Sequence, residues 1–483
     1  MIKVIFVVKP GKNILAATGI TYKKENKQKR KDNIMKKISK IIALLCMAVM
    51  VFGLIAACDN SNAPYVCKCD VIELTFSFWG DASELETTQA ALDVFNDMQD
   101  RINVTAIQIP NEQYGERLLT MAGSANMPDT GMVDERTAIG WAREGILLPI
   151  DIYAGQASRP KDGITFRDGG NVVAYSVASE VLALWFNRDM FDAAGVPYPP
   201  TTIDTAWSWD EFIDVAKKLT IDSNGNNATS ADFDANNIVQ YGAYVNQWVW
   251  QLEVWALSNG GRWYSQDGQS IVFDAAAIEG MQKVYNLHLV DKVAPFNDGT
   301  ADNGWWSSLG AGNVAMATDG QWSVGFAGDT DIDYGVGVLP YMAKPANITA
   351  GGPVGVFADT KHPEAAAEFL RWYSNPENNW GPIEWGWWMP NMMNWFTEES
   401  LLQRWIDNAP NRARLNAADF RSAIADVAIN TSVTQPTGWY YTPNTDQVDR
   451  ILIPALVEAA NGTKTVEQVI NEVRPALDAA LAG

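Results

Sequence analysis

The sequence predicts an α/β protein made of two lobes, and three observations support this fold class. The chain has 483 residues, a length that suits two lobes or domains and gives each an ample core. From residue 71 onward, strand and helix patterns alternate, as they do where helices wrap a parallel sheet. A second block with the same alternation begins near Val172.

The first block reads strand, helix, strand, helix, strand. Its opening strand ends at Trp79-Gly80-Asp81, and Pro110 stops the second one. The third strand is short and ends at Asp134-Glu135. The expected strands cover residues 71–78, 102–109 and 130–133, and the expected helices cover residues 83–97 and 113–122.

The second block is recognised by a capping box, Ser208-Trp-Asp-Glu211, which begins an amphipathic helix. A second capping box begins at Thr465 and opens the last helix. Further strands are expected at 173–177, 182–186, 241–245, 314–318 and 333–339, and further helices at 248–257, 275–290, 363–373, 401–406, 420–428, 447–461 and 465–482.

An apolar run, Ile41–Cys58, follows Lys36, Lys37 and Lys40 and precedes a polar stretch. This order is typical of a secretory signal peptide, and Ile55-Ala-Ala-Cys58 resembles a bacterial lipobox, which makes Cys58 the expected lipidated residue. An uncleaved anchor and an ordinary signal peptide are the alternatives. The run to Ala57 has 17 residues, against the roughly 20 that a spanning helix needs.

The start of the chain is expected at Met35, so residues 1–34 are a wrongly extended start or a long basic region. Residues 1–57 are therefore left out of the fold prediction, and 58–70 form a lipidated tether. Twelve of the 36 basic residues but two of the 57 acidic residues precede Cys58, so the remaining chain has a net charge near −31. Such a chain repels nucleic acid and anionic lipid, and membrane attachment must then come from the lipid.

Common enzyme and metal motifs are missing from the sequence. It has no nucleophile elbow, no zinc-protease motif and no phosphate-binding loop. Cys67 and Cys69 have no second cysteine pair or nearby His to complete a metal site. The loop Asp222–Asp234 resembles a calcium loop but lacks Gly and Glu at the sixth and twelfth positions, which favours a polar surface loop over calcium binding. No cofactor and no metal are expected.

Tryptophan is unusually abundant, with 20 residues in the chain. Several stand beside Gly, Asn and Asp, which indicates an aromatic-lined cleft as well as core positions. The clusters are Trp248, Trp250 and Trp255; Trp305 and Trp306; and Trp385, Trp387 and Trp388.

An ordered set of short motifs resembles the extracellular solute-binding proteins of bacterial ABC importers, in the carbohydrate-binding family. The match spans almost all of residues 72–475. Its most specific stretch runs from Tyr175-Ser-Val through Leu182–Phe191 to Trp209–Phe212. The other blocks are Leu119–Asp129, Gly145–Asp151, Ser258–Gly261, Gly312–Met316, Gly320–Trp322, Lys361–Ala365 and Met389-Pro390.

The resemblance implies a periplasmic-binding-protein-like fold of type II, with two discontinuous lobes joined by a hinge. Lobe one is expected from residues 71–175 and 343–387, and lobe two from 176–342 and 388–483. The chain is expected to return from lobe two near Leu339–Lys344 and to cross again near Trp385–Asn391.

Ligands of open α/β sheets bind beyond the carboxyl ends of the strands. That rule selects Trp79, Asp81, Asp134, Glu135, Asp319 and Trp322 as ligand-binding residues. By motif match the family also uses positions that correspond here to Glu180, Trp250, Trp255, Gly352 and Trp388. Trp79, Trp250 and Trp255 have a helix or lobe core as their alternative, and Asp134 and Glu180 can equally be solvated hinge charges.

The resemblance implies a lipoprotein on the outer face of the bacterial cell membrane, and we expect a monomer. It would bind a sugar or short oligosaccharide and deliver it to an ABC permease without catalysing a reaction. One alternative is an extracellular glycosidase, which needs two carboxylates roughly 5–10 Å apart. Another is the same fold with a different solute, such as a peptide, or with a sensory partner.

Overall fold

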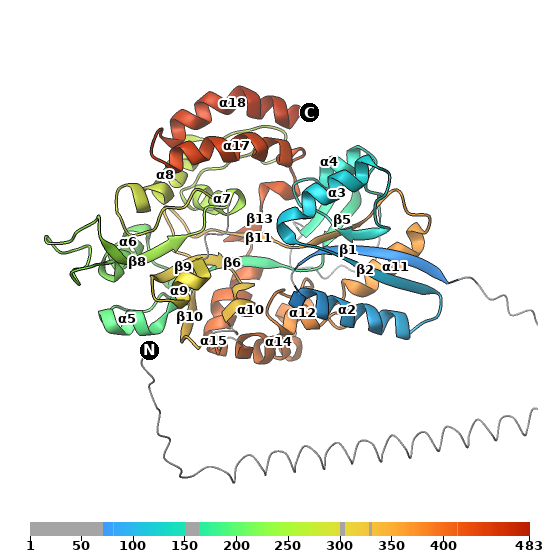
Figure 1. Ribbon diagram of the computed structural model, residues 1–483, viewed down its shortest axis with the longest axis horizontal. Helices are drawn as coiled ribbons and strands as arrows, with labels where there is room; N and C mark the ends of the chain where they lie inside the picture. Colours follow the sequence, from blue (N-terminus) through green and yellow to red (C-terminus); the bar gives the residue numbers. More distant parts are fainter. Residues whose placement is uncertain (1–70, 81, 151–163, 300–304, 328–330, 413) are drawn as a thin grey trace, which may run out of the picture. The chain divides into compact units, whose positions relative to one another are not determined.

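The computed structural model describes residues 71–80, 82–150, 164–299, 305–327, 331–412 and 414–483. They belong to one compact unit, residues 70–483, which is treated by itself below (Figure 1). The expected signal segment, the tether and Cys58 lie outside the described residues. Among the helices within the ranges above, none is long and apolar enough to cross a membrane.

The first sheet has six strands in the order β2-β1-β3-β12-β5-β4. The strand β1 pairs in parallel with β2 and β3, as the alternating pattern predicts. The sheet is nevertheless mixed, because β12 and β5 run antiparallel to their neighbours. The strands are β1 Ile72–Trp79, β2 Ile102–Ile109, β3 Thr130–Met132, β4 Thr165–Asp168, β5 Asn171–Ser176 and β12 Pro353–Val356.

The second sheet follows the order β13-β11-β6-β9-β8-β7, with β10 paired to β6. Its central strand β6 is flanked by the buried strand β9, and β8 pairs in parallel with β9. The strands are β6 Glu180–Asn187, β7 Ile221–Asp222, β8 Ile238–Val245, β9 Val314–Gly320, β10 Tyr334–Gly337, β11 Asn347–Ala350 and β13 Thr434–Pro436.

Helices cover both sheets and bury three apolar clusters. The first sheet packs against α2 Ala82–Asp97, α3 Tyr114–Gly123, α4 Ala138–Arg143 and α11 Pro363–Tyr373. One cluster of the second sheet includes residues of α6 Trp209–Leu219, α7 Val249–Ser258, α8 Ala275–Leu289, α17 Thr445–Ala460 and α18 Val466–Ala482. The other cluster includes residues of α10 Ser323–Ala327, α13 Asn394–Thr397, α14 Glu399–Arg412, α15 Ala417–Phe420 and α16 Asp426–Ile429. In Figure 1, α17 and α18 lie side by side above the second sheet.

Both capping boxes are present, at Ser208 before α6 and at Thr465 before α18. The loop that resembles a calcium site is instead closed by the carboxylate of Asp222, which accepts hydrogen bonds from the backbone N–H groups of Asn224, Asn226 and Asp234. The remaining helices are α5 Arg188–Ala194, α9 Trp305–Gly310 and α12 Gly381–Glu384.

The chain passes between the sheets at places that differ in part from the expected ones. It leaves the first sheet after Ser176 and enters the second at Glu180. It returns at Gly351-Gly352 rather than near Leu339–Lys344, because β11 still pairs with β6 of the second sheet. The strand β11 has only four residues, and their alternation of polar and apolar side chains is too short to predict a strand from the sequence.

Gly242 lies where β8 meets α6, and we expect Gly242→Ala to destabilise the fold. A Cβ atom there would stand 1.9 Å from the carbonyl oxygen of Ala216. Overpacking of this kind costs about 1–3 kcal/mol. Thermal unfolding should show a clear fall in Tm, whereas Gly123→Ala, where a Cβ meets nothing within 4 Å, should leave Tm unchanged. Equal Tm values for the two variants would contradict this packing.

Candidate functional site

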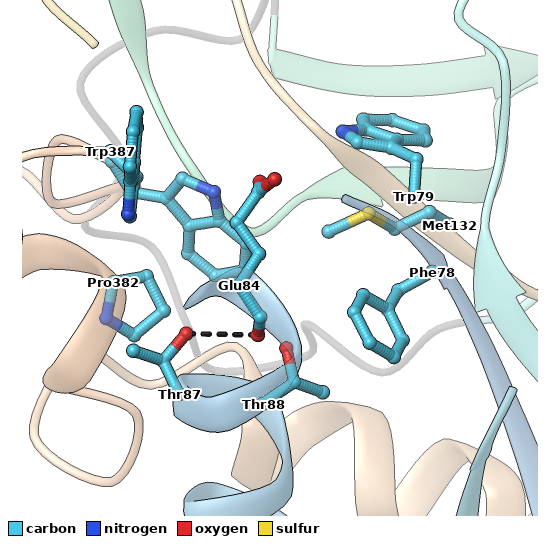
Figure 2. A pocket seen from close by; sticks show the side chains of 9 residues that line it. Phe78, Trp79, Glu84, Thr87, Thr88, Met132, Pro382 and Trp387 are labelled. Atoms are coloured by element: carbon cyan, nitrogen blue, oxygen red, sulfur yellow. Dashed lines mark hydrogen bonds between the residues drawn. The ribbon is translucent and has the colours of Figure 1, made fainter. Parts of the chain in front are cut away.

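A small pocket lies where the first sheet meets α12 and the segment that follows it. Its walls come from the end of β1, the start of α2, β3 and the loop that follows α12 (Figure 2). The lining residues are Phe78, Trp79, Glu84, Thr87, Thr88, Met132, Pro382, Trp387 and Trp388.

The Glu84 carboxylate points into the space between Trp79 and Trp387 in Figure 2. Glu84 stands in the first turn of α2, and its backbone carbonyl accepts a hydrogen bond of 3.0 Å from the Thr87 hydroxyl. Trp79 is held edge-on by the ring of Tyr114, with centroids 5.2 Å apart and an angle of 84° between the planes. The pocket therefore presents one acidic group among aromatic faces.

Two of the tryptophan rings at the site lie directly on glycine backbone. A Cβ on Gly325 would stand 2.5 Å from the ring of Trp387, and one on Gly320 would stand 2.0 Å from the ring of Trp322. Any side chain at these positions would push the indole away. The glycines thus let flat rings approach the ends of β9 and α10.

A second aromatic group lies on the side of the second sheet. Trp322 is 5.9 Å from Trp250, which in turn is 6.1 Å from Trp439, measured between ring centroids. The Trp322 indole N–H donates a 3.2 Å hydrogen bond to the Asp319 carboxylate, which is 3% exposed. Asp319 also accepts from Gln251 and Ser323, so it fixes the orientation of the Trp322 ring.

A hydrogen bond connects the two groups. The Gln321 side-chain amide donates to the backbone carbonyl of Trp387 over 3.0 Å. Gln321 follows β9 of the second sheet, while Trp387 lines the pocket with residues of the first. The two sides of the candidate site are thereby in direct contact.

Carboxyl groups converge between the two aromatic groups. Burial raises the pKa of Glu180 well above its usual range, and the nearby carboxylates of Glu135, Asp319 and Glu84 raise it further. Burial also raises the pKa of Glu135 to about 8. Both groups therefore favour the protonated form near neutral pH, in which a carboxyl can donate as well as accept a hydrogen bond.

The structure brings together several of the residues expected from the sequence and places others elsewhere. Trp79 and Trp388 line the pocket, and Gly352 lies beside the Trp79 ring. Trp250, Trp322 and Asp319 form the second group. Glu135 and Glu180 lie at the crossings between the sheets. Asp81 lies outside the described residues.

Two expected residues have other partners. Trp255 is 1% exposed and packs edge-on against Trp209 with centroids 5.0 Å apart, so it occupies the core position that was its alternative. Asp134 forms a two-bond ion pair with Arg136, at 2.9 and 2.5 Å.

Sequence reasoning missed Glu84, Trp439 and Met132 as residues of the site. Glu84 follows Trp79 by less than two helical turns, so the rule on strand ends could have included it. Trp439 and Met132 carry no local signal, because only the packing of distant segments brings them there.

The described residues that line the pocket include no Lys, Arg or His. Ring faces, a carboxyl group and hydroxyl groups suit a neutral, hydroxyl-rich solute with apolar C–H faces. Within the ranges that the structure describes, no three His, Cys, Asp or Glu side chains are arranged to hold a metal ion.

Two sheets that each have helices and a core of their own define a two-lobed α/β fold. The family model of the bacterial extracellular solute-binding proteins matches residues 81–380, and the chain belongs to this family. A maltotriose-binding protein from Pyrococcus abyssi is 24% identical over 315 residues, which cover 61% of each chain. A putative binding protein from Brucella abortus is 24% identical over 23% of this chain and 26% of its own length. The chain thus spans less than two thirds of these relatives.

Solved structures share the fold at low sequence identity. An ABC substrate-binding protein from Listeria monocytogenes in complex with cycloalternan is 20% identical with a TM-score of 0.70, covering 86% of this chain and all of that one. The maltose/maltodextrin-binding domain MalE from Bdellovibrio bacteriovorus bound to maltotriose is 17% identical with a TM-score of 0.67, covering 85% and 100%. These matches confirm the expected two-lobed periplasmic-binding-protein-like fold.

Glu253 gives a pH-dependent prediction for the fold around the site. Its carboxylate is 3% exposed and accepts from the Gly438 backbone N–H at 3.0 Å, and burial raises its pKa to about 7. Because the folded protein favours the protonated form, stability from this group is full below pH 4.5 and is lost as pH rises through 7.

We therefore expect the stability of the wild type relative to Glu253→Gln to fall by about 3 kcal/mol between pH 4.5 and 7.5. Denaturant unfolding at several pH values measures this difference. The exposed Glu86→Gln variant on α2 should show no such change. A pH-independent difference for Glu253→Gln would contradict the assignment.

Proposed function

We propose that this protein binds a neutral sugar or short oligosaccharide between its two lobes and delivers it to an ABC transporter permease. The observation that carries the proposal is the pocket lined by Trp79, Trp387 and Trp388, in which the Glu84 carboxylate lies between Trp79 and Trp387. Sugar rings offer apolar C–H faces to indoles and a rim of hydroxyls to carboxyl and amide groups.

The size of the pocket indicates that binding requires motion. Its cavity volume of about 10 Å³ lies far below the range of about 300–1,000 Å³ typical of small-molecule sites. An oligosaccharide therefore needs the two aromatic groups to separate before it enters. Hinge motion at the crossings 177–179 and 351–352 would provide this opening.

The relatives support a carbohydrate over other solutes. The matched Pyrococcus abyssi protein binds maltotriose by its name, and the two solved structures described above hold cycloalternan and maltotriose. The acidic lining also disfavours anionic solutes, because a second negative charge would be repelled at low dielectric.

We further propose that the protein performs no catalysis and acts as a monomer. Its family is one of solute-binding proteins. Glu84 and Glu180 could serve as the carboxylate pair of a glycosidase, so analysis of the sugar after long incubation distinguishes the two functions. Recovery of intact sugar supports binding alone, and cleavage products would support the glycosidase.

Replacing a ring of the pocket should weaken sugar binding. We expect Trp388→Ala to raise the Kd for the sugar that binds best at least tenfold, because it removes a stacking face. Calorimetry with a panel that includes maltotriose and cycloalternan provides the measurement. Trp372→Ala is the matched control, since that ring packs on Phe95 with centroids 5.1 Å apart and does not line the pocket. Equal losses in both variants would argue against this pocket.

We also propose that Cys58 carries a lipid that attaches the protein to the outer face of the cell membrane. Residues 58–70 then form a tether of about a dozen residues, which can extend roughly 40 Å. This reach suits a mobile receptor whose acidic body stays off the surface, and the lipid keeps it close to a permease.

The anchor is tested by cell fractionation. Cys58→Ala should release the protein from the membrane fraction and leave its sugar affinity unchanged, because Cys58 precedes the folded unit. Cys67→Ala is the matched control and should stay with the membrane. Retention of the Cys58→Ala protein on the membrane would mean that the apolar run is an uncleaved anchor.

A further inference from the structure

Four crossing segments lie side by side: three lead from one sheet to the other, and the fourth leaves the second sheet, contacts the first through Tyr440 and returns to the second. The backbone N–H of Val177 donates to Gly352 over 3.0 Å, and that of Ser179 donates to Met389 over 3.3 Å. A Cβ on Gly351 would stand 2.3 Å from the Ala178 carbonyl oxygen, so these two segments are in close contact. The segments are residues 176–180, 351–352, 389–391 and 437–441.

The Glu135 side chain connects two of these segments to the first sheet. Glu135 follows β3, and its Oε1 accepts a 3.0 Å hydrogen bond from the backbone N–H of Gly351. The same oxygen accepts from the Tyr440 hydroxyl at 3.3 Å. One carboxyl oxygen thus binds the return crossing and the C-terminal crossing together.

Tyr440 packs in the core of the first lobe, and its neighbour Trp439 packs in the core of the second. The Tyr440 ring stacks on Phe166 of the first sheet, with centroids 4.3 Å apart and planes at 25°, and belongs to that sheet's core. Trp439 belongs to the core of the second sheet and contacts Trp250. If the angle between the two sheets changes, the backbone conformation of this short segment must therefore change with it.

The hydrogen bonds continue from Tyr440 to the remaining segments. Its hydroxyl is 3.0 Å from that of Ser176 at the end of β5. The Asn391 amide, which is fully buried, donates to the Ser176 carbonyl at 3.3 Å and to the Tyr175 hydroxyl at 3.1 Å. All four crossings are thereby linked through polar side chains that are buried among them.

We propose that Glu135 is a positioning residue of the hinge: its carboxyl group holds Gly351 and Tyr440 together and so favours the arrangement of the lobes in this structure over a more widely separated one. The proposal rests on the solute-binding function proposed above and assigns Glu135 a role other than contact with the solute. It gives a role to a half-buried carboxyl group that stands beside other acids at a point where the two sheets are connected.

The charges around Glu135 determine how this contact behaves. Asp134 brings negative charge close to it, while Arg136 offsets part of that charge. Glu180 also lies close by, and burial raises its pKa well above the usual range. The Gly351 and Tyr440 groups are both donors to Oε1, so the contact remains when the carboxyl is protonated on its other oxygen. A glutamine keeps the same acceptor, whereas an alanine removes it.

Measurement of the lobe separation without sugar tests the proposal directly. Spin labels at Asp93→Cys on α2 and Lys218→Cys on α6, both exposed positions, report the separation in a full chain whose four native cysteines are serine. We expect Glu135→Ala to shift the distance distribution toward longer values. Glu135→Gln should restore the distribution of the parent protein, which a general loss of stability would not do.

Affinity provides the second readout. For the sugar with the tightest binding, we expect Glu135→Ala to raise Kd about tenfold and Tyr440→Phe about fivefold, with Glu135→Gln within about threefold of the parent. Tyr244→Phe is the matched control, because it removes a buried hydroxyl that accepts a 2.7 Å hydrogen bond from Asn297 away from the crossings. It should change neither readout.

An unchanged distance distribution in Glu135→Ala would overturn the proposal, whatever happens to the affinity. If the parent protein binds none of the sugars, the proposed function fails, but the distances still decide the role of Glu135. A shift that glutamine does not restore would also overturn it, because the acceptor that glutamine keeps would then not be what holds the hinge.

Discussion

The structure depends on one constraint, which is that two separately built sheets must be joined by a few short segments at one place. Each sheet has its own core, and residues of the candidate site stand at the edges where the strands end. The crossings cannot be covered by a regular sheet, so their backbone groups are satisfied by side chains such as Glu135 and Asn391. This explains why buried polar groups concentrate there.

The crossings between the sheets also show how acidic side chains are accommodated at a site of low dielectric. Glu135 and Glu180 share a region of low dielectric, and each would repel the other if both were ionised. Raised pKa values allow these groups to remain neutral, and Glu135 accepts hydrogen bonds from Gly351 and Tyr440. A neutral carboxyl beside aromatic rings is also a good partner for sugar hydroxyls, so the requirements of the hinge and of the proposed solute site agree.

Two glycines allow aromatic rings of the candidate site to lie directly against the backbone. Gly320 and Gly325 have no side chain where the indoles of Trp322 and Trp387 lie, and Asp319 fixes the first of these rings through its N–H group. Rings held from behind in this way lose little freedom when a solute stacks on them. The abundance of tryptophan therefore serves two purposes, with Trp255 in the core and Trp388 at the pocket.

The sequence by itself determined the elements with long, regular patterns. Strand β2 and helix α11 have the bounds that their patterns predicted. Both capping boxes stand at the start of the helices that they predict. Hydrophobic periodicity and backbone capping depend on neighbouring residues, so the sequence shows both directly. It also indicated Trp79 and Trp388 as residues of the site. Tertiary structure alone decided that β11 belongs to the second sheet, that Trp255 is buried while Trp439 joins Trp250, and that Glu135 meets Tyr440. Those residues lie far apart in the chain, and their contacts follow from how two sheets pack, which no local pattern encodes.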